Sequence, residues 1–285
     1  IFKFGLSLNP SVTIENAVNS DGAYNKDGGG IIASALHSAP IFPVYNADGS
    51  FCFAQNAWSP NTQTTLEDGS VKKGNSQTQV WNPVALALLQ KDETKASRIF
   101  GNVYGEVAFM PELKYRANFG VDIYNSSQDT FRPSTIPVAN TEGNPESEPE
   151  ATAKTAKMYN WLFEQTVTYN KDIKGHSISA LAGWTMQYQR DESTYAFANG
   201  FITNNVPTLN AGTVTRGDSH ASEWALLSGL ARVQYNYKGK YMVTGALRAD
   251  GASRFGKDNR WGWFPSVSAG WRLTEEPFMK SLTFI

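Results

Sequence analysis

The side chains that most often carry catalysis are sparse in this sequence. The histidines and the cysteine stand far apart, at His37, Cys52, His176 and His220. The segment "RGDSHASE" places Asp218, Ser219 and His220 side by side. A Ser–His–Asp relay needs these side chains at separate positions that the fold brings together. His176 falls in a predicted turn and has no candidate partner. The sequence therefore predicts no catalytic centre, and an exposed polar loop is the expected place of His220.

Motifs for metals, phosphates or adhesion are equally weak. No HExxH or Cys–His spacing indicates zinc, and the aspartates show no regular calcium-ligand spacing. The "DGGG" at 27–30 does not continue into the "GK[ST]" of a phosphate-binding loop. The "RGD" at 216–218 is too short a match to indicate adhesion. We expect neither an enzyme nor a bound cofactor or metal.

Composition excludes further classes. The 285 residues include 25 Lys and Arg against 26 Asp and Glu, a net charge of −1. Nucleic-acid binders usually carry a basic footprint, so none is expected here. No run of about 18 apolar residues predicts a transmembrane helix. Membrane-spanning strands stay possible, because their alternating residues leave the mean hydropathy low.

Strict alternation of apolar and polar residues is the main structural signal. "LKYRANFGVDIY" (113–124) alternates without a break, which is typical of a strand with one apolar and one charged face. The pattern recurs in runs near 2–15, 98–109, 160–169, 177–189, 225–237, 241–250 and 260–273. The apolar face would be the core of a soluble sandwich, or the lipid-facing side of an outer-membrane barrel.

Strand length and aromatic placement favour the barrel. A membrane-spanning strand needs about 9–11 residues, against about 5–6 in soluble proteins. Ten residues tilted by about 45° cover roughly 23 Å, close to the lipid-facing band of about 25 Å. Aromatic residues at the ends of the runs are predicted to lie at the two membrane interfaces: Trp261, Trp263, Trp271, Tyr235, Tyr237 and Tyr241.

The connections between runs alternate in length. Short turns are predicted at 110–113, 171–176 and 237–240, and long polar segments at 17–94, 126–156, 194–221 and 251–259. In outer-membrane barrels the short turns are periplasmic and the long loops extracellular. The segment before Pro40 is expected to hold one short helix.

Several blocks of the sequence resemble one family. "LRADGASRFGKDNRWGWFPSVSAGWRLTEEPFMK" (247–280) is similar to a signature of SusC/RagA-like TonB-dependent outer-membrane transporters. Further similar blocks are "APIFPVYNADGSF", "WNPVALALLQ", "YNWLFEQTVTYNKDIKGHSISALAGW" and "SEWALLSGLARVQYNYKGKYMVTGALRADG". The resemblance covers nearly the whole chain.

The resemblance implies an all-β fold, with residues 1–285 forming part of one transmembrane barrel domain in the outer membrane of a Gram-negative bacterium. We expect roughly eight to nine antiparallel strands of a plugged barrel of about 22. The plug, TonB box and signal peptide are expected outside this piece. The implied partners are a SusD-like lipoprotein lid, the TonB complex, membrane lipid and an oligosaccharide or, less often, peptide cargo. The alternatives are a passive porin and an adhesin or structural barrel.

Two sets of side chains are candidate functional residues. Six charges are predicted to meet near the extracellular mouth, at Arg248, Asp250, Arg254, Lys257, Asp258 and Arg260. An ion-pair network that holds the loop and the plug to the wall is favoured over direct cargo contact. The aromatic residues of the first long loop, Tyr45, Trp58 and Trp81, could contact cargo or lid. A small core within the loop is the favoured alternative.

Overall fold

The computed structural model of the chain describes most of its residues. These are residues 1–18, 30–38, 40, 43–52, 63–65, 71–73, 82–136, 138–139, 145–146 and 148–279. Within this part of the chain, no helix is both long and apolar enough to cross a membrane.

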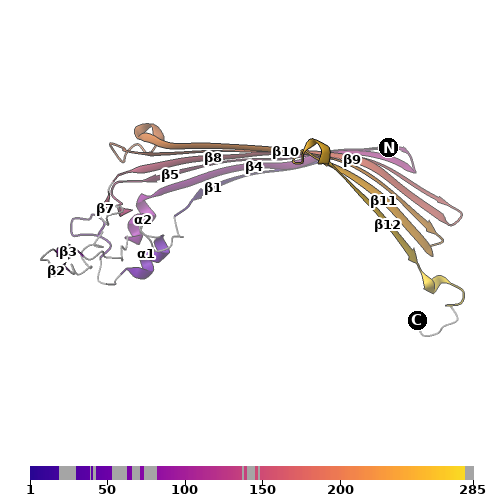
Figure 1. Cartoon of the computed structure of the whole chain (residues 1–285), viewed down its shortest axis with the longest axis horizontal. Coiled ribbons are helices and arrows are strands. Elements are labelled where there is room, and N and C mark those ends of the chain that lie inside the picture. The colour runs from indigo at the N-terminus through magenta and orange to yellow at the C-terminus, as the bar shows by residue number, and fades with distance from the viewer. Residues whose placement is uncertain are drawn as a thin grey trace.

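One curved antiparallel sheet makes up most of the molecule (Figure 1). Its eight strands are β1 (Phe2–Asn16), β4 (Lys91–Met110), β5 (Leu113–Arg132), β8 (Glu150–Ile173), β9 (His176–Asn199), β10 (Thr213–Tyr237), β11 (Tyr241–Ala252) and β12 (Trp261–Trp271). They follow one another across the sheet in chain order, so that each pairs with the strand before it. The predicted all-β antiparallel fold is confirmed.

Small elements lie outside this sheet, most of them where its strands meet the long connections, with η4 after the short-turn end of β12. They are α1 (Ile31–His37), the ribbon of β2 (Gln63–Thr65) and β3 (Val71–Lys73), α2 (Pro83–Leu89), the ribbon of β6 (Val138–Ala139) and β7 (Pro145–Glu146), and the 3₁₀ turns η2 (Leu209–Ala211), η3 (Lys257–Asn259) and η4 (Leu273–Glu275). Helix α1 is the helix expected before Pro40. Helix α2 starts after Asn82, whose side chain accepts hydrogen bonds from the backbone N–H of Val84 and Ala85 at 3.1 and 3.2 Å.

The register of the strands gives the sheet two distinct faces. Paired residues share a face, so Val103, Phe119 and Phe163 line up on one side, and Met186 and Leu227 continue the same row. The opposite face carries rows of polar residues. This pattern holds from β1 to β12, and it confirms the division of faces inferred from alternation.

The apolar face has little protein against it. Phe4, Trp263 and Val267 are 74%, 65% and 82% exposed. Apart from Ala85, the buried apolar residues in the described part of the chain form two small clusters near the long connections: Phe131, Ala151, Ala198 and Phe201 in one, and Leu86 and Ile136 in the other. Such a continuous exposed apolar surface is typical of a face that meets a membrane or a partner.

The strands are longer than alternation predicted. Strands β4, β5, β8, β9 and β10 run for 20 to 25 residues, whereas β1, β11 and β12, with 15, 12 and 11 residues, are close to their predicted runs. The long connections therefore shrink to 17–90, 133–149, 200–212 and 253–260. The expectation of a loop at "RGDSHASE" was wrong, since these residues lie in β10. Both faces of the strands are polar here, which hides the two-residue period.

Two short turns at the opposite end share one sequence. Lys174–Gly175 joins β8 to β9, and Lys238–Gly239 leads from β10 toward β11. The lysines have φ of 47° and 53°, and the glycines 90° and 69°. Positive φ at both central positions is the hairpin geometry that matches strand twist. A non-glycine residue adopts it at a cost of about 1–2 kcal/mol.

Candidate functional site

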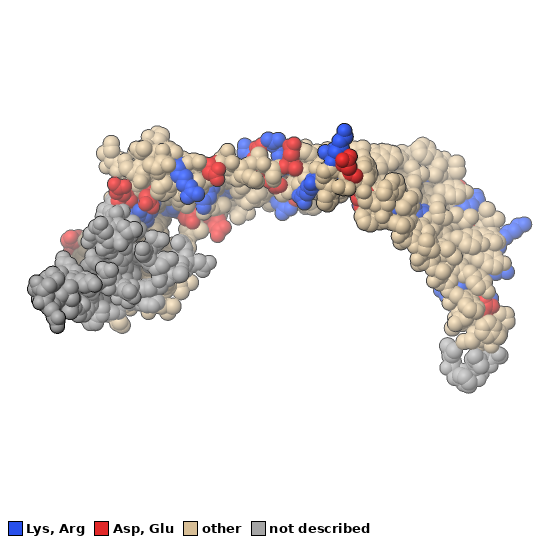
Figure 2. Space-filling view, viewed as in Figure 1, with Lys and Arg blue, Asp and Glu red and all other residues tan. Residues whose placement is uncertain are grey.

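The polar face of the sheet is the candidate functional surface. Figure 1 shows the sheet as an arch, with helices α1 and α2 on its hollow side. The segment after β9 curls over the outer side of the arch, where Phe201 packs on Phe131 of the apolar face. The apolar face is thus convex and the polar face concave. Lys, Arg, Asp and Glu side chains gather over the left and middle of the arch, and fewer lie on the right limb (Figure 2).

Hydrogen bonds join neighbouring strands midway along the polar face. The Asn102 Nδ2 donates to Asn118 Oδ1 at 2.9 Å, and the Asn118 Nδ2 donates to Glu164 Oε2 at 3.1 Å. Beside this row of hydrogen bonds, the Arg116 guanidinium lies 4.0 Å from the centre of the Tyr104 ring. The contacts cross from β4 to β8, so they tie the wall together as well as making it polar.

Arg248 and Asp250 continue this surface on β11. The Arg248 Nε lies 2.8 and 2.9 Å from the two Asp250 carboxylate oxygens, and its Nη2 donates to Ser228 Oγ at 3.2 Å. The Ser228 side chain is buried. Arg248, Ser228, Arg116 and Glu164 line one shallow hollow of about 330 Å³. The structure thus places this predicted pair on the polar face, across the same hollow as the Asn118–Glu164 hydrogen bond.

The other four charges of the predicted network do not join this pair. Arg254 lies over the Trp224 ring at 4.8 Å, and the Arg260 Nε donates to the Phe255 carbonyl oxygen at 3.2 Å. Lys257 and Asp258 are exposed in η3. In the described part of the chain, none of the four makes an ion pair within 4.0 Å. Whether the six charges serve structure or cargo stays a prediction.

A second hollow, of about 400 Å³, lies farther toward the long connections. Its lining includes Lys154, Tyr195, Asp218 and His220. The Lys154 Nζ and the Arg216 guanidinium lie 5.8 and 5.4 Å from the Tyr195 ring centre. An aromatic ring among hydrogen-bonding groups is a common arrangement in ligand sites. The sequence did not indicate this surface, because these residues fell in predicted loops.

The loop aromatic residues are only partly described. Tyr45 bridges to Phe51, with ring centroids 5.0 Å apart, around a turn in which Asp48 accepts from Ser50. Hydrogen bonds from the Ser50 side chain and backbone hold the pKa of Asp48 below its usual value. This is local packing within the loop. Trp58 and Trp81 lie outside the described residues.

Aromatic residues border the apolar face near the short turns. Tyr237, Tyr241 and Trp271 lie in sequence across β10, β11 and β12, with neighbouring ring centroids 6.4 and 6.2 Å apart. Tyr235 lies one row above them, while Trp261 and Trp263 stand at the other end of β12. All six predicted interface residues therefore lie on the apolar face, at or near the strand ends of β10 to β12.

His176 has partners that the sequence did not reveal. Its Nδ1 lies 2.6 Å from the Tyr235 hydroxyl, and its ring centroid is 4.6 Å from that of Tyr237. Both tyrosines come from β10, which pairs with β9 in a register that brings position 237 opposite 176. The prediction that His176 has no partner was wrong, because the register of β9 against β10 cannot be read from the sequence.

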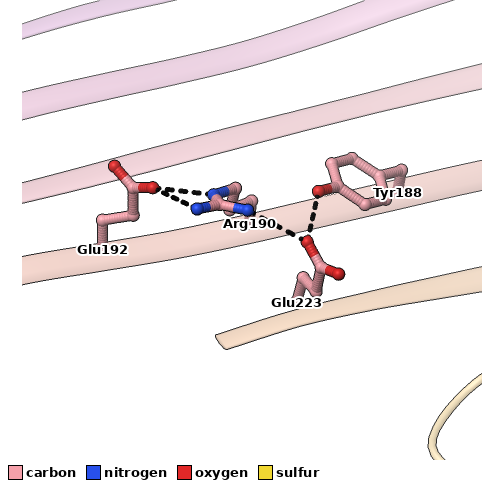
Figure 3. A network of polar contacts seen from close by, with 4 residues as sticks. All are labelled: Tyr188, Arg190, Glu192 and Glu223. Carbon is pink, nitrogen blue, oxygen red and sulfur yellow. Dashed lines mark hydrogen bonds and ion pairs between the residues drawn. The ribbon is translucent and has the colours of Figure 1, made fainter. Parts of the chain in front are cut away.

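A polar network marks the other border of the apolar face (Figure 3). The Tyr188 hydroxyl donates to Glu223 at 2.8 Å, and Arg190 bridges Glu223 and Glu192 at 3.2 and 2.7 Å. Tyr188 lies twelve residues from His176 on β9. At about 3.3 Å per residue and a tilt near 45°, this span is roughly 28 Å high. The apolar band thus has the height of a bilayer's hydrocarbon core.

No family model matches the sequence. Among curated proteins, the chain is 33% identical to TonB-dependent receptor P3 of Formosa agariphila over 98% of its own length. It is 27% identical over 91% of its length to TonB-dependent receptor SusC of Bacteroides thetaiotaomicron. The chain belongs to the SusC-like TonB-dependent receptors. It spans about a quarter of these relatives, 26% and 25% of their lengths.

Solved structures support the same fold for this SusC-like chain. A chain in the structure of the RagAB peptide transporter matches with a TM-score of 0.70 and 18% identity, covering 98% of this chain and 29% of that one. The RagAB peptide importer in its closed-closed state gives a TM-score of 0.70 at 19% identity, with the same coverage. The sheet is therefore a segment of β-barrel wall. The relatives are receptors and transporters, not enzymes.

Proposed function

We propose that the chain forms part of the wall of an outer-membrane importer that takes up a nutrient with energy from the TonB complex. The observation that carries the proposal is the two-faced sheet: a bilayer-high apolar band on the convex side and a hydrogen-bonded polar surface on the concave side. A barrel wall needs lipid outside and a hydrated or protein-filled lumen inside. The family supplies the nutrient-import context.

In this proposal the short turns face the periplasm and the long connections face the exterior. The lengths support that orientation, since the turns at the ends of β4, β8 and β10 are tight and the segment 17–90 is the longest connection. Strands β8 to β10 then project about ten residues beyond the apolar band. Their polar concave surface, with the hollow around Tyr195, would line the extracellular vestibule.

Two partners belong to the proposal. A SusD-like lipoprotein would cover the extracellular mouth, and the TonB complex would act through parts of the protein outside this chain. The similarity to SusC and to the RagAB peptide transporter supports a two-component importer. For cargo we propose an oligosaccharide, with a peptide as the second candidate because RagAB is described as a peptide transporter.

For the charges at the mouth we propose a structural role. Arg248 and Asp250 already satisfy each other, and Ser228 accepts a further hydrogen bond from the guanidinium. A side chain whose donors are committed to neighbours has fewer to offer a moving cargo. The pair would instead fix the β10–β11 wall and present a preorganised surface to the plug.

The deciding experiment measures uptake by cells that carry the full-length protein. Labelled oligosaccharide and peptide pools are offered with and without functional TonB. The importer predicts uptake that disappears when TonB is lost, while the protein stays in the outer membrane. Uptake that persists without TonB would indicate a passive porin. Absence of all uptake, with cell attachment that depends on the protein, would indicate an adhesin.

A further inference from the structure

The Lys–Gly turns hold two cations in an unfavourable backbone conformation. Among the described residues, Lys174 and Lys238 are the only non-glycine residues with positive φ. Asparagine, aspartate or glycine would fit this turn position with less strain. A strained residue that persists at two equivalent places suggests that its side chain has a use.

The two turns are in direct contact. The Lys238 backbone N–H donates to the Gly175 carbonyl oxygen at 2.6 Å. A Cβ added to Gly175 would lie 3.0 Å from the Lys238 Cγ, so the aliphatic stem of this lysine packs over the neighbouring turn. The two lysines therefore stand on adjacent turns of the rim, and Figure 2 shows Lys and Arg side chains at this end of the sheet.

Aromatic side chains connect this cationic stretch to the apolar face. The Lys238 Nζ lies 5.2 Å from the centre of the Tyr237 ring, which belongs to the apolar face. The Tyr235 hydroxyl and the His176 Nδ1 are paired at 2.6 Å immediately above. Ile178 and Val243, in the row of Tyr235, are exposed on the same face. A lipid could therefore place its polar headgroup against the lysines and its acyl chains against the apolar face.

Two neighbouring lysines are neutralised by carboxylates, whereas Lys174 and Lys238 are not. Lys171 pairs with Glu112 on one side, and the Lys240 Nζ lies 3.5 Å from a Glu276 carboxylate oxygen on the other. Within the described residues no carboxylate lies within 4.0 Å of the Lys174 or Lys238 ammonium. Asp172, close by in sequence, pairs with Ser177 on the opposite, polar face.

We propose that Lys174 and Lys238 bind the phosphate of an anionic phospholipid, with its acyl chains along the apolar face above Tyr235 and Tyr237. The site rests on the proposed function, because it needs the short turns to lie at the periplasmic leaflet. Ammonium groups near an anionic bilayer attract such headgroups, and tyrosine and histidine rings are suited to the interface. The hydrogen bond between the two turns holds the two lysine backbones side by side before any lipid arrives.

The test uses the full-length barrel reconstituted in vesicles of phosphatidylcholine with a minor fraction of phosphatidylglycerol. Retained lipid is measured by native mass spectrometry on the inserted protein. The double variant Lys174→Asn/Lys238→Asn removes both charges and keeps a residue that tolerates positive φ. The matched control is Lys114→Asn, which removes a cation at the same end of the sheet from the polar face.

We expect the double variant to lose about thirty-fold in preference for phosphatidylglycerol, because each lysine contributes roughly fivefold near an anionic surface. The control should keep the preference of the unmodified protein. Equal retention by the double variant, equal loss in the control, or displacement of the lipid by inorganic phosphate would overturn the site. Failure of the unmodified protein to insert would instead refute the proposed function.

Discussion

Placing an arginine at Leu247 tests which face of the sheet meets lipid. Leu247 is half-exposed on the apolar face, in register with Ala231 and Pro265. It lies six residues from Tyr241, the interface end of β11. Six residues at about 3.3 Å, tilted by about 45°, raise it roughly 14 Å above that end, near the middle of a band of about 25 Å.

An arginine at this depth should cost about 2–4 kcal/mol, because its charge enters hydrocarbon. That corresponds to a loss of roughly thirty- to several-hundred-fold in the ratio of folded to unfolded barrel. The control is Thr244→Arg on the same strand, whose side chain lies on the polar face beside Ser268 and Gln234. Both variants are made in the full-length protein and compared by the fraction of inserted, protease-resistant barrel. Equal damage from the two would refute the assignment of faces.

Three further predictions concern individual side chains and glycines of the barrel wall. Replacing Arg248 by alanine should lower barrel assembly, because it leaves a carboxylate without its partner, while uptake per inserted barrel stays unchanged; loss of uptake at normal insertion would show a binding role. The hydrogen bond from Lys171 holds the pKa of Glu112 below its usual value of 4.5, so its stabilising effect is present above that value and is lost as pH falls through the lowered pKa. Melting temperature measured against pH should therefore fall less steeply at acid pH in Glu112→Gln, and identical curves would contradict the pairing. A Cβ at Gly101 would lie 2.5 Å from a β1 carbonyl oxygen, so Gly101→Ala should cost about 1–3 kcal/mol, whereas Gly229→Ala meets nothing within 4 Å and should leave the measured thermal stability almost unchanged.

The sequence was most informative where one face of a strand is apolar. The alternation from Leu113 to Tyr124 identified β5 and its two faces, because all side chains on one face have an apolar environment and all those on the other a polar one. The alternation of apolar and polar residues disappears where the strands extend beyond the apolar band. In β10 the stretch around Arg216 and His220 is polar on both sides, so it read as a loop although it pairs with β9 over its full length.

Side-chain contacts between neighbouring strands could not be predicted from the sequence alone. The bond between His176 and Tyr235 depends on the register of β9 against β10, and a shift of one residue would place the two on opposite faces. The hollow around Tyr195 needs five strands, β4, β5, β8, β9 and β10, in their observed order. By contrast, Arg248 and Asp250 are two residues apart on one strand, and their shared face follows from the strand period alone.

The uneven heights of neighbouring strands leave a long free edge in the rim. Pairing between β10 and β11 begins at Leu226 and Ala252, so the described strand from Thr213 to Trp224 is paired only with β9. Its other side has no strand partner among the described residues, so its free N–H and C=O groups are open to water or to an added strand. Arg216, Asp218 and Glu223 place charge along this edge. Charged side chains on an edge strand disfavour pairing with other chains. The unpaired edge of β10 can therefore stay exposed without promoting aggregation.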